Sequence, residues 1–158
     1  MNQFWLGLLG GFLGAALGVL GSEFVKFFLE PGRCLEAFRN NILEEMLAEI
    51  GKIEKIGAAY WNGEYPSKSP EIWAVEQDIK AGLHGLVRNA VDLFDGHQHA
   101  RSTCEGKIRA LRILVTGGSF GDGQQINDPQ IALEIKTTTL DLKRILRNNR
   151  QKLKRRFL

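Results

Sequence analysis

The sequence predicts an all-α protein in which a single N-terminal transmembrane helix precedes a cytoplasmic antiparallel four-helix bundle. Two observations support this fold class. An uncharged run, Phe4–Gly21, opens a chain that is otherwise polar, and apolar residues recur every three or four positions through the remainder. No segment shows the alternation typical of strands. We therefore expect a transmembrane and interfacial helix over residues 1–31 and the bundle, with a basic C-terminal end, over residues 32–158.

The uncharged run is long enough to cross a bilayer. At about 1.5 Å per residue it spans about 27 Å, close to the hydrocarbon thickness of about 30 Å. A cleaved signal peptide is disfavoured because Met1-Asn2-Gln3 has no basic side chain and no small-residue cleavage site follows cleanly. The other alternative is a buried helix of a water-soluble fold, in which each glycine of the run costs up to about 1 kcal/mol relative to alanine.

The glycines of this run lie on one side of the predicted helix. A rotation of about 100° per residue places all of them within an arc of about 100°. A separate face is occupied by Leu6, Leu9, Leu13, Leu17 and Leu20. The Gly10-x-x-x-Gly14-x-x-x-Gly18 pattern lets a second helix backbone approach closely. The alternative, that glycine is simply common in membrane helices, stays open. We expect oligomerisation through Gly7, Gly10, Gly11, Gly14, Gly18 and Gly21.

Beyond Ser22 the helix is expected to continue as an amphipathic interfacial turn and to end at Pro31-Gly32, since proline and glycine interrupt helices. Basic residues follow the span and none precedes it. Under the positive-inside rule the protein is then a single-pass protein of the inner (cytoplasmic) membrane, with its N-terminus outside and its bundle in the cytoplasm.

The first bundle helix is predicted over Cys34–Trp61, and a turn over Asn62–Ser69 separates it from the second helix. Ser69-Pro70-Glu71 supplies an N-cap, a proline at N1 and an acid in the first turn. The expected core positions of the first helix are Leu35, Phe38, Ile42, Met46, Ile50, Ile53, Ile56 and Tyr60; those of the second are Ile72, Val75, Ile79, Leu83, Leu86, Val87, Ala90 and Phe94.

Asp95-Gly96 ends the second helix, and a third follows over approximately Gln98–Thr116. The glycine-rich stretch that comes next is interpreted as a flexible interhelical loop, because it neither follows a strand nor opens a helix as phosphate-binding loops do. Asp128-Pro129 then caps a fourth helix. Short connections predict antiparallel neighbours, with Cys104, Ile108, Leu111, Val115, Ile131, Ile135, Thr138, Leu142 and Ile145 facing inward.

Charge is distributed unevenly along the chain. The net charge is +3, with 21 basic and 18 acidic residues, yet eight basic residues and no acidic one lie in the last sixteen positions. The rest of the chain is therefore acidic, which argues against a uniformly basic nucleic-acid surface. The antiparallel order returns the fourth helix to the membrane side, where anionic lipid headgroups attract basic residues. A solvated tail and contact with nucleic acid are the two alternatives. We expect membrane-interface contacts by Glu23, Lys26, Arg147, Arg150, Lys152, Lys154, Arg155 and Arg156.

We identify no catalytic residue, metal site or cofactor site in the sequence. Metal-binding residue types gather only around His97 and His99, and residues two apart on a helix diverge by about 200°. No Ser/His/Asp spacing or acidic pair suggests nucleophilic or acid–base catalysis. His84 lies between core positions of the second helix and is expected to be partly buried.

The pair Arg88-Asn89, late in the second helix of a four-helix body, resembles the HEPN ribonuclease fold. The catalytic motif of that family is an Arg, often followed by Asn, with a His a short helical spacing later. Here the next histidine is His97, beyond Gly96, so the resemblance covers the architecture and one dipeptide. A membrane helix before an inactive HEPN-like bundle is similar to the small accessory membrane-pore effectors of some RNA-targeting CRISPR systems. That resemblance implies a role in antiviral defence.

We therefore predict a membrane-anchored homo-oligomer that forms a pore or otherwise perturbs the bilayer, with the bundle as its sensor or gate. Its expected partners are the lipid bilayer, further copies of itself and anionic lipid headgroups. It is not predicted to be an enzyme. The alternative is a membrane-tethered HEPN-like ribonuclease or RNA-binding adaptor, and a membrane-anchored scaffold is a third possibility.

Overall fold

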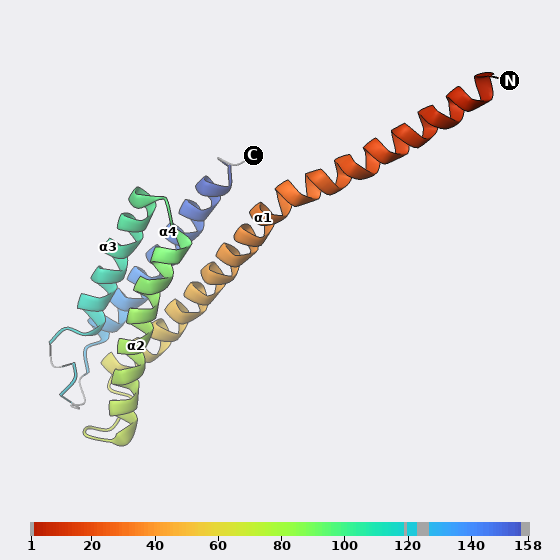
Figure 1. Cartoon of the computed structure of the whole chain (residues 1–158). Coiled ribbons are helices and arrows are strands. Elements are labelled where there is room, and N and C mark those ends of the chain that lie inside the picture. Colours follow the sequence, from red (N-terminus) through yellow and green to blue (C-terminus); the bar gives the residue numbers. More distant parts are fainter. Residues whose placement is uncertain (1, 119, 123–126, 156–158) are drawn as a thin grey trace. The chain divides into compact units, whose positions relative to one another are not determined.

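The structure is a computed structural model that describes the backbone of residues 2–118, 120–122 and 127–155, and the side chains from residue 32 to 153 with the same internal gaps. Within these residues the chain is all-α, as predicted, with helices α1 (Asn2–Trp61), α2 (Pro70–Leu93), α3 (Gln98–Val115) and α4 (Pro129–Arg155) (Figure 1). The only strand-like pairing among them is a single antiparallel bridge between Asn62 and Asn127.

The chain divides into two compact units, Met1–Asn40 and Asn41–Leu158. Helix α1 contributes to both, because it runs without interruption through Pro31 and Gly32. The predicted helix end at these two residues is therefore wrong. Proline removes one backbone hydrogen bond of the helix and disfavours the preceding turn, but the turns on either side can still form a continuous helix.

The second unit is a four-helix bundle in which successive helices are antiparallel (Figure 1). Contacts between α1 and α2 pair high residue numbers of one helix with low numbers of the other: Tyr60 contacts Glu76, and Lys52 contacts Asp78. On the other side of α1, Lys143 of α4 binds Glu54. Helix α3 packs against both α2 and α4, which completes the ring of four helices.

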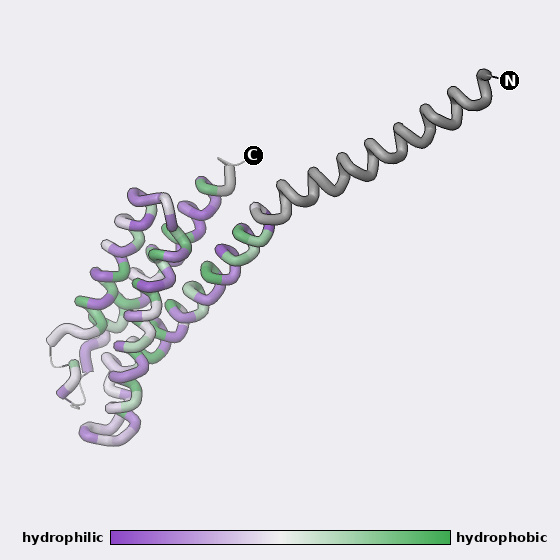
Figure 2. The backbone as a smooth tube through the Cα atoms, in the orientation of Figure 1, coloured by the Kyte–Doolittle hydropathy of each residue, from purple (hydrophilic) through white to green (hydrophobic). Residues whose placement is uncertain are grey.

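One face of each bundle helix forms the hydrophobic core, and Figure 2 shows apolar and polar positions interleaved along each helix. Most predicted core positions of α1, α2 and α3 from Ile42 onward are buried, including Met46, Ile50 and Ile53, whereas Ile56 and Val75 are only partly buried. Leu35 and Phe38 are 49% and 54% exposed because they precede Asn41, where the bundle begins. Val87 is also exposed, at 41%.

The buried stripe of α4 lies about one position further along the helix than predicted. Ile135 and Leu142 are buried as expected, but Thr139 is buried where Thr138 was predicted. The Thr139 hydroxyl donates to the carbonyl oxygen of Lys136 at 2.9 Å, which satisfies its hydrogen-bonding capacity. The other core residues of this helix are Ala132, Leu146 and Leu153.

Capping residues define the helix starts that the sequence predicts. The Ser69 hydroxyl accepts a hydrogen bond from the Ile72 amide at 3.2 Å, directly before Pro70. The Asp128 carboxylate accepts from the amides of Gln130 and Ile131 at 3.1 and 3.2 Å, directly before Pro129. These contacts satisfy amides that have no partner within the first turn of a helix.

We predict that Ser69→Ala lowers the free energy of unfolding by about 1 kcal/mol, since it removes the side-chain acceptor for the Ile72 amide. Chemical denaturation of the purified protein measures this loss. Ser102→Ala is the matched control, because Ser102 lies exposed within α3 and alanine favours a helix. Equal effects of the two substitutions would contradict the assignment of Ser69 as the N-cap.

Candidate functional site

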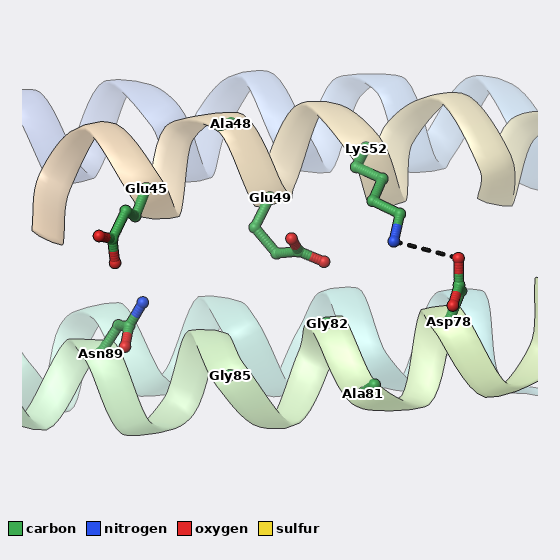
Figure 3. Close-up of a pocket in the computed structure, with 9 residues that line it drawn as sticks. All are labelled: Glu45, Ala48, Glu49, Lys52, Asp78, Ala81, Gly82, Gly85 and Asn89. Carbon is green, nitrogen blue, oxygen red and sulfur yellow. Dashed lines mark ion pairs between the residues drawn. The ribbon is translucent and has the colours of Figure 1, made fainter.

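A polar groove of about 660 Å³ lies between α1 and α2. We call it the acidic groove; its lining residues are Glu45, Ala48, Glu49, Lys52, Asp78, Ala81, Gly82, Gly85 and Asn89. Figure 3 shows the polar side chains of the two helices extending toward each other across it. The carboxylates outnumber the single lysine, so the groove carries a net negative charge.

Small residues form one wall of the acidic groove. At Gly82, a Cβ atom would displace the Glu49 carboxylate, the end of a flexible side chain, and would come within 3.2 Å of the Ile53 side chain. At Gly85, one turn further along α2, a Cβ atom would meet nothing within 4 Å. Glu49 therefore lies against Gly82, while the groove is open beside Gly85.

The charges of the acidic groove are only partly compensated. Lys52 and Asp78 form an ion pair of 3.1 Å, and the hydrogen bond to Asp78, followed by its charge, raises the pKa of Lys52. Glu45 and Glu49 form no ion pair within 4 Å among the residues that the structure describes, although the charge of Glu49 also contributes to the raised pKa of Lys52. Two carboxylates on successive turns of α1 therefore remain available to a cationic partner.

A second polar cluster is buried at the end of the bundle where α1 ends. Glu76 of α2 is fully buried, and its Oε1 accepts hydrogen bonds from the Tyr60 hydroxyl at 3.0 Å and the Gly121 amide at 3.1 Å. Burial, followed by the hydrogen bond to Glu76, raises the pKa of Tyr60. Phe120 packs on the Tyr60 ring, and the Lys80 ammonium lies 5.6 Å from the centre of the Phe120 ring.

Two residues of the glycine-rich stretch, Phe120 and Gly121, belong to this cluster and contact α1 and α2. The sequence analysis missed Glu76. Its signal was present: Glu76 follows Ile72 by four residues and precedes Ile79 by three, which is the spacing of the buried stripe. An acid at a stripe position indicates a buried carboxylate with hydrogen-bond donors around it.

The basic end of α4 is partly engaged within the bundle. Lys143 binds Glu54 at 2.7 Å, with both side chains about three-quarters buried, and Arg144 binds Asp141 on the exposed surface at 2.9 Å. Arg150 is buried, with 7% of its surface exposed. Of the predicted membrane-interface residues, the structure describes only Arg147 and Lys152 as exposed.

Several predicted site residues fall outside the described side chains, and the structure does not place them. They are Gly7, Gly10, Gly11, Gly14, Gly18, Gly21, Glu23, Lys26, Lys154, Arg155 and Arg156. Among the residues whose side chains the structure describes, no helix contains a stretch that is both long enough and apolar enough to cross a membrane. The predicted span Phe4–Gly21 lies outside those residues.

The histidine region shows no metal cluster: within the described part of the chain, no group of three or more His, Cys, Asp or Glu side chains is placed to hold an ion. Cys104 is buried, and Glu105 pairs with Arg101 at 2.7 Å. His84 is exposed, so the prediction of a partly buried histidine is wrong. Arg88 is exposed on α2, Asn89 lines the acidic groove, and His97 lies at the N-terminus of α3.

Comparisons with protein-family models, with curated protein sequences and with solved structures found no match to this chain.

We predict that Gly85→Ala raises the free energy of unfolding by up to about 1 kcal/mol, because alanine favours the helix and its methyl group meets open space. Gly82→Ala brings the same gain in helix propensity but displaces Glu49 and crowds Ile53. It should therefore stabilise less than Gly85→Ala, or destabilise. Urea denaturation of the two variants compares them, and equal stabilisation would contradict the close contact at Gly82.

The buried thiol of Cys104 predicts a loss of stability at alkaline pH. Burial, followed by the charge of Glu105, raises the pKa of Cys104 from 9.0 to about 12. Between pH 9 and pH 12 the thiol ionises only in the unfolded chain. The stability that the protonated, buried thiol contributes is therefore complete below pH 9. Above pH 9 this stability is lost by up to about 1.4 kcal/mol per pH unit. When the free energy of unfolding is measured as a function of pH, it should decline less steeply above pH 9 in Cys104→Ala than in the wild type. Cys34→Ala, at an exposed cysteine, should leave the decline unchanged.

Proposed function

We propose that this protein is a membrane-anchored homo-oligomer that permeabilises the bilayer as a pore, with the bundle as its cytoplasmic sensor or gate. The observation that carries the proposal is the uncharged run Phe4–Gly21 with its glycines on one helical face. A glycine face lets helix backbones pack closely, which is a principal source of association within lipid. Several copies packed in this way would form a ring of helices.

The fold supports the proposal through the continuity of α1. The helix that carries the uncharged run also supplies Ile42, Met46, Ile50 and Ile53 to the bundle core. A ligand or partner that changes how the bundle helices pack therefore acts on the same helix that would lie in the membrane. Rigid secondary elements are one route by which energetic coupling is carried between distant sites.

The resemblance to accessory membrane effectors extends this proposal to antiviral defence, with an RNA-targeting system providing the trigger. The second candidate function is a membrane-tethered HEPN-like ribonuclease or RNA-binding adaptor. It is favoured by Arg88-Asn89, because Arg88 is exposed on α2 and Asn89 lines the acidic groove beside it. An exposed arginine could contact phosphate, and the amide could contact a base or a ribose.

We predict that Gly14→Leu combined with Gly18→Leu dissociates the oligomer and abolishes leakage of ions from liposomes that contain the protein. Leucine keeps the run hydrophobic enough to insert but prevents close backbone approach. Cross-linking in membranes measures assembly, and release of an encapsulated dye measures leakage. Leu13→Ile combined with Leu17→Ile, on the leucine face, is the matched control and should retain both.

An unchanged oligomer and unchanged leakage in the glycine double variant would count against the proposal. RNA cleavage by the purified protein, without leakage and lost in both Arg88→Ala and His97→Ala, would favour the ribonuclease instead.

A further inference from the structure

The acidic groove and the basic end of α4 have complementary charges on a single chain. Glu45 and Glu49 face the groove without an ion-pair partner among the described residues. The last sixteen residues carry eight of the 21 basic side chains and no acidic one, although Lys143 and Arg144 are paired within the bundle and Arg150 is buried in it. At described positions near this end, Arg147 and Lys152 are exposed. Opposite charges attract across a surface and help to fix which surfaces meet.

The α4 helix of the same copy cannot fill the acidic groove. Its Lys143 is bound to Glu54, which is nine residues beyond Glu45 on α1. At about 100° per residue, nine residues turn the helix by about 180°, so Glu54 and Glu45 lie on opposite sides of α1. Gly51 also faces α4, because a Cβ atom there would lie 3.9 Å from Lys143 Nζ. The groove therefore faces away from the α4 of its own copy.

The dimensions of the two surfaces agree. From Glu45 to Lys52 the α1 wall of the groove covers seven residues, about 10 Å at about 1.5 Å per residue. Arg147 and Lys154 are also seven residues apart in the sequence, and α4 extends to Arg155. The open wall at Gly85 and Ala81 offers space for the aliphatic parts of arginine and lysine side chains. Their charged ends would then meet the carboxylates of Glu45 and Glu49.

We propose that the acidic groove binds the basic C-terminal segment, residues 147–158, of a second copy of this chain. The inference rests on the proposed homo-oligomer and identifies one of its contacts outside the membrane. Each copy has one groove and one basic segment, so the contact is head-to-tail, and a head-to-tail contact repeated around an axis closes into a ring. The unpaired carboxylates of the groove favour this partner for the segment over lipid headgroups.

The test is a charge exchange in the full-length protein in nanodiscs at low salt. One variant carries Glu45→Lys and Glu49→Lys, and a second carries Arg147→Glu and Lys154→Glu, two positions whose seven-residue spacing places them on one side of a helix. Each should raise the concentration at which the oligomer dissociates by about tenfold or more, because like charges then face each other. Mixing the two variants should restore assembly, since their altered surfaces again have opposite charges. Added salt should weaken the wild-type contact.

A matched control carries Glu44→Lys and Asp92→Lys, which changes the net charge as much as the groove variant does but alters exposed residues outside the groove lining. It should assemble as the wild type does. Circular dichroism establishes that every variant retains its helices. Restoration in the mixture excludes misfolding as the cause of dissociation.

Assembly that is unchanged in both charge variants, or that is not restored by mixing, would overturn the groove contact while leaving the glycine-mediated oligomer in place. Loss of binding to vesicles of anionic lipid in the tail variant alone, with assembly intact, would assign the segment to lipid headgroups and also overturn it. A monomeric wild-type protein would overturn both this contact and the proposed function.

Discussion

Burial of one stripe of α1 is the constraint on which the bundle depends. Met46, Ile50 and Ile53 are completely buried, and the stripe ends in Tyr60 and Trp61, each about 2% exposed. Burying an aliphatic side chain of this size contributes roughly 1.5–3 kcal/mol relative to leaving it exposed. The other three helices cover this stripe. The acidic groove and the ion pair of Lys52 with Asp78 lie on the side of α1 toward α2. A second groove, of about 510 Å³, and the ion pair of Lys143 with Glu54 lie on the side toward α4.

The polar contacts at the end of α1 complete this packing. The indole Nε1 of Trp61 donates to the Val115 carbonyl oxygen at 3.0 Å, and the Asp128 amide donates to the Trp61 carbonyl oxygen at 2.7 Å. Tyr60 donates to the buried carboxylate of Glu76. Burying a polar group costs free energy unless it is hydrogen-bonded, so these contacts favour one placement of α2, α3 and the start of α4 around the end of α1. The same helix is the one that we propose to lie in the membrane.

Local signals in the sequence predicted most of the bundle. Ser69-Pro70 and Asp128-Pro129 specify helix starts through caps that act within one turn. Gly96, which follows α2, has a φ of 74°, a backbone conformation that favours glycine. The predicted helix end at Pro31 was wrong because proline destabilises only the helical turn next to it, whereas the continuation of the helix depends on the turns on both sides. The acidic groove could not be predicted, because it pairs residues of two helices whose alignment is set only by packing. Arg150 is also buried, although arginine is usually exposed, whereas the burial of Glu76 follows from its place in the buried stripe of α2.

The most direct measurement is the mass of the protein extracted from membranes in its native lipid, for example by mass photometry in nanodiscs. Our account predicts that the full-length protein stays with the membrane fraction and forms a particle of one defined multiple of the 17.7 kDa chain. A pore of packed helices requires several copies in one particle. A particle that contains a single chain, or a protein that remains in solution without lipid or detergent, would contradict the central claim.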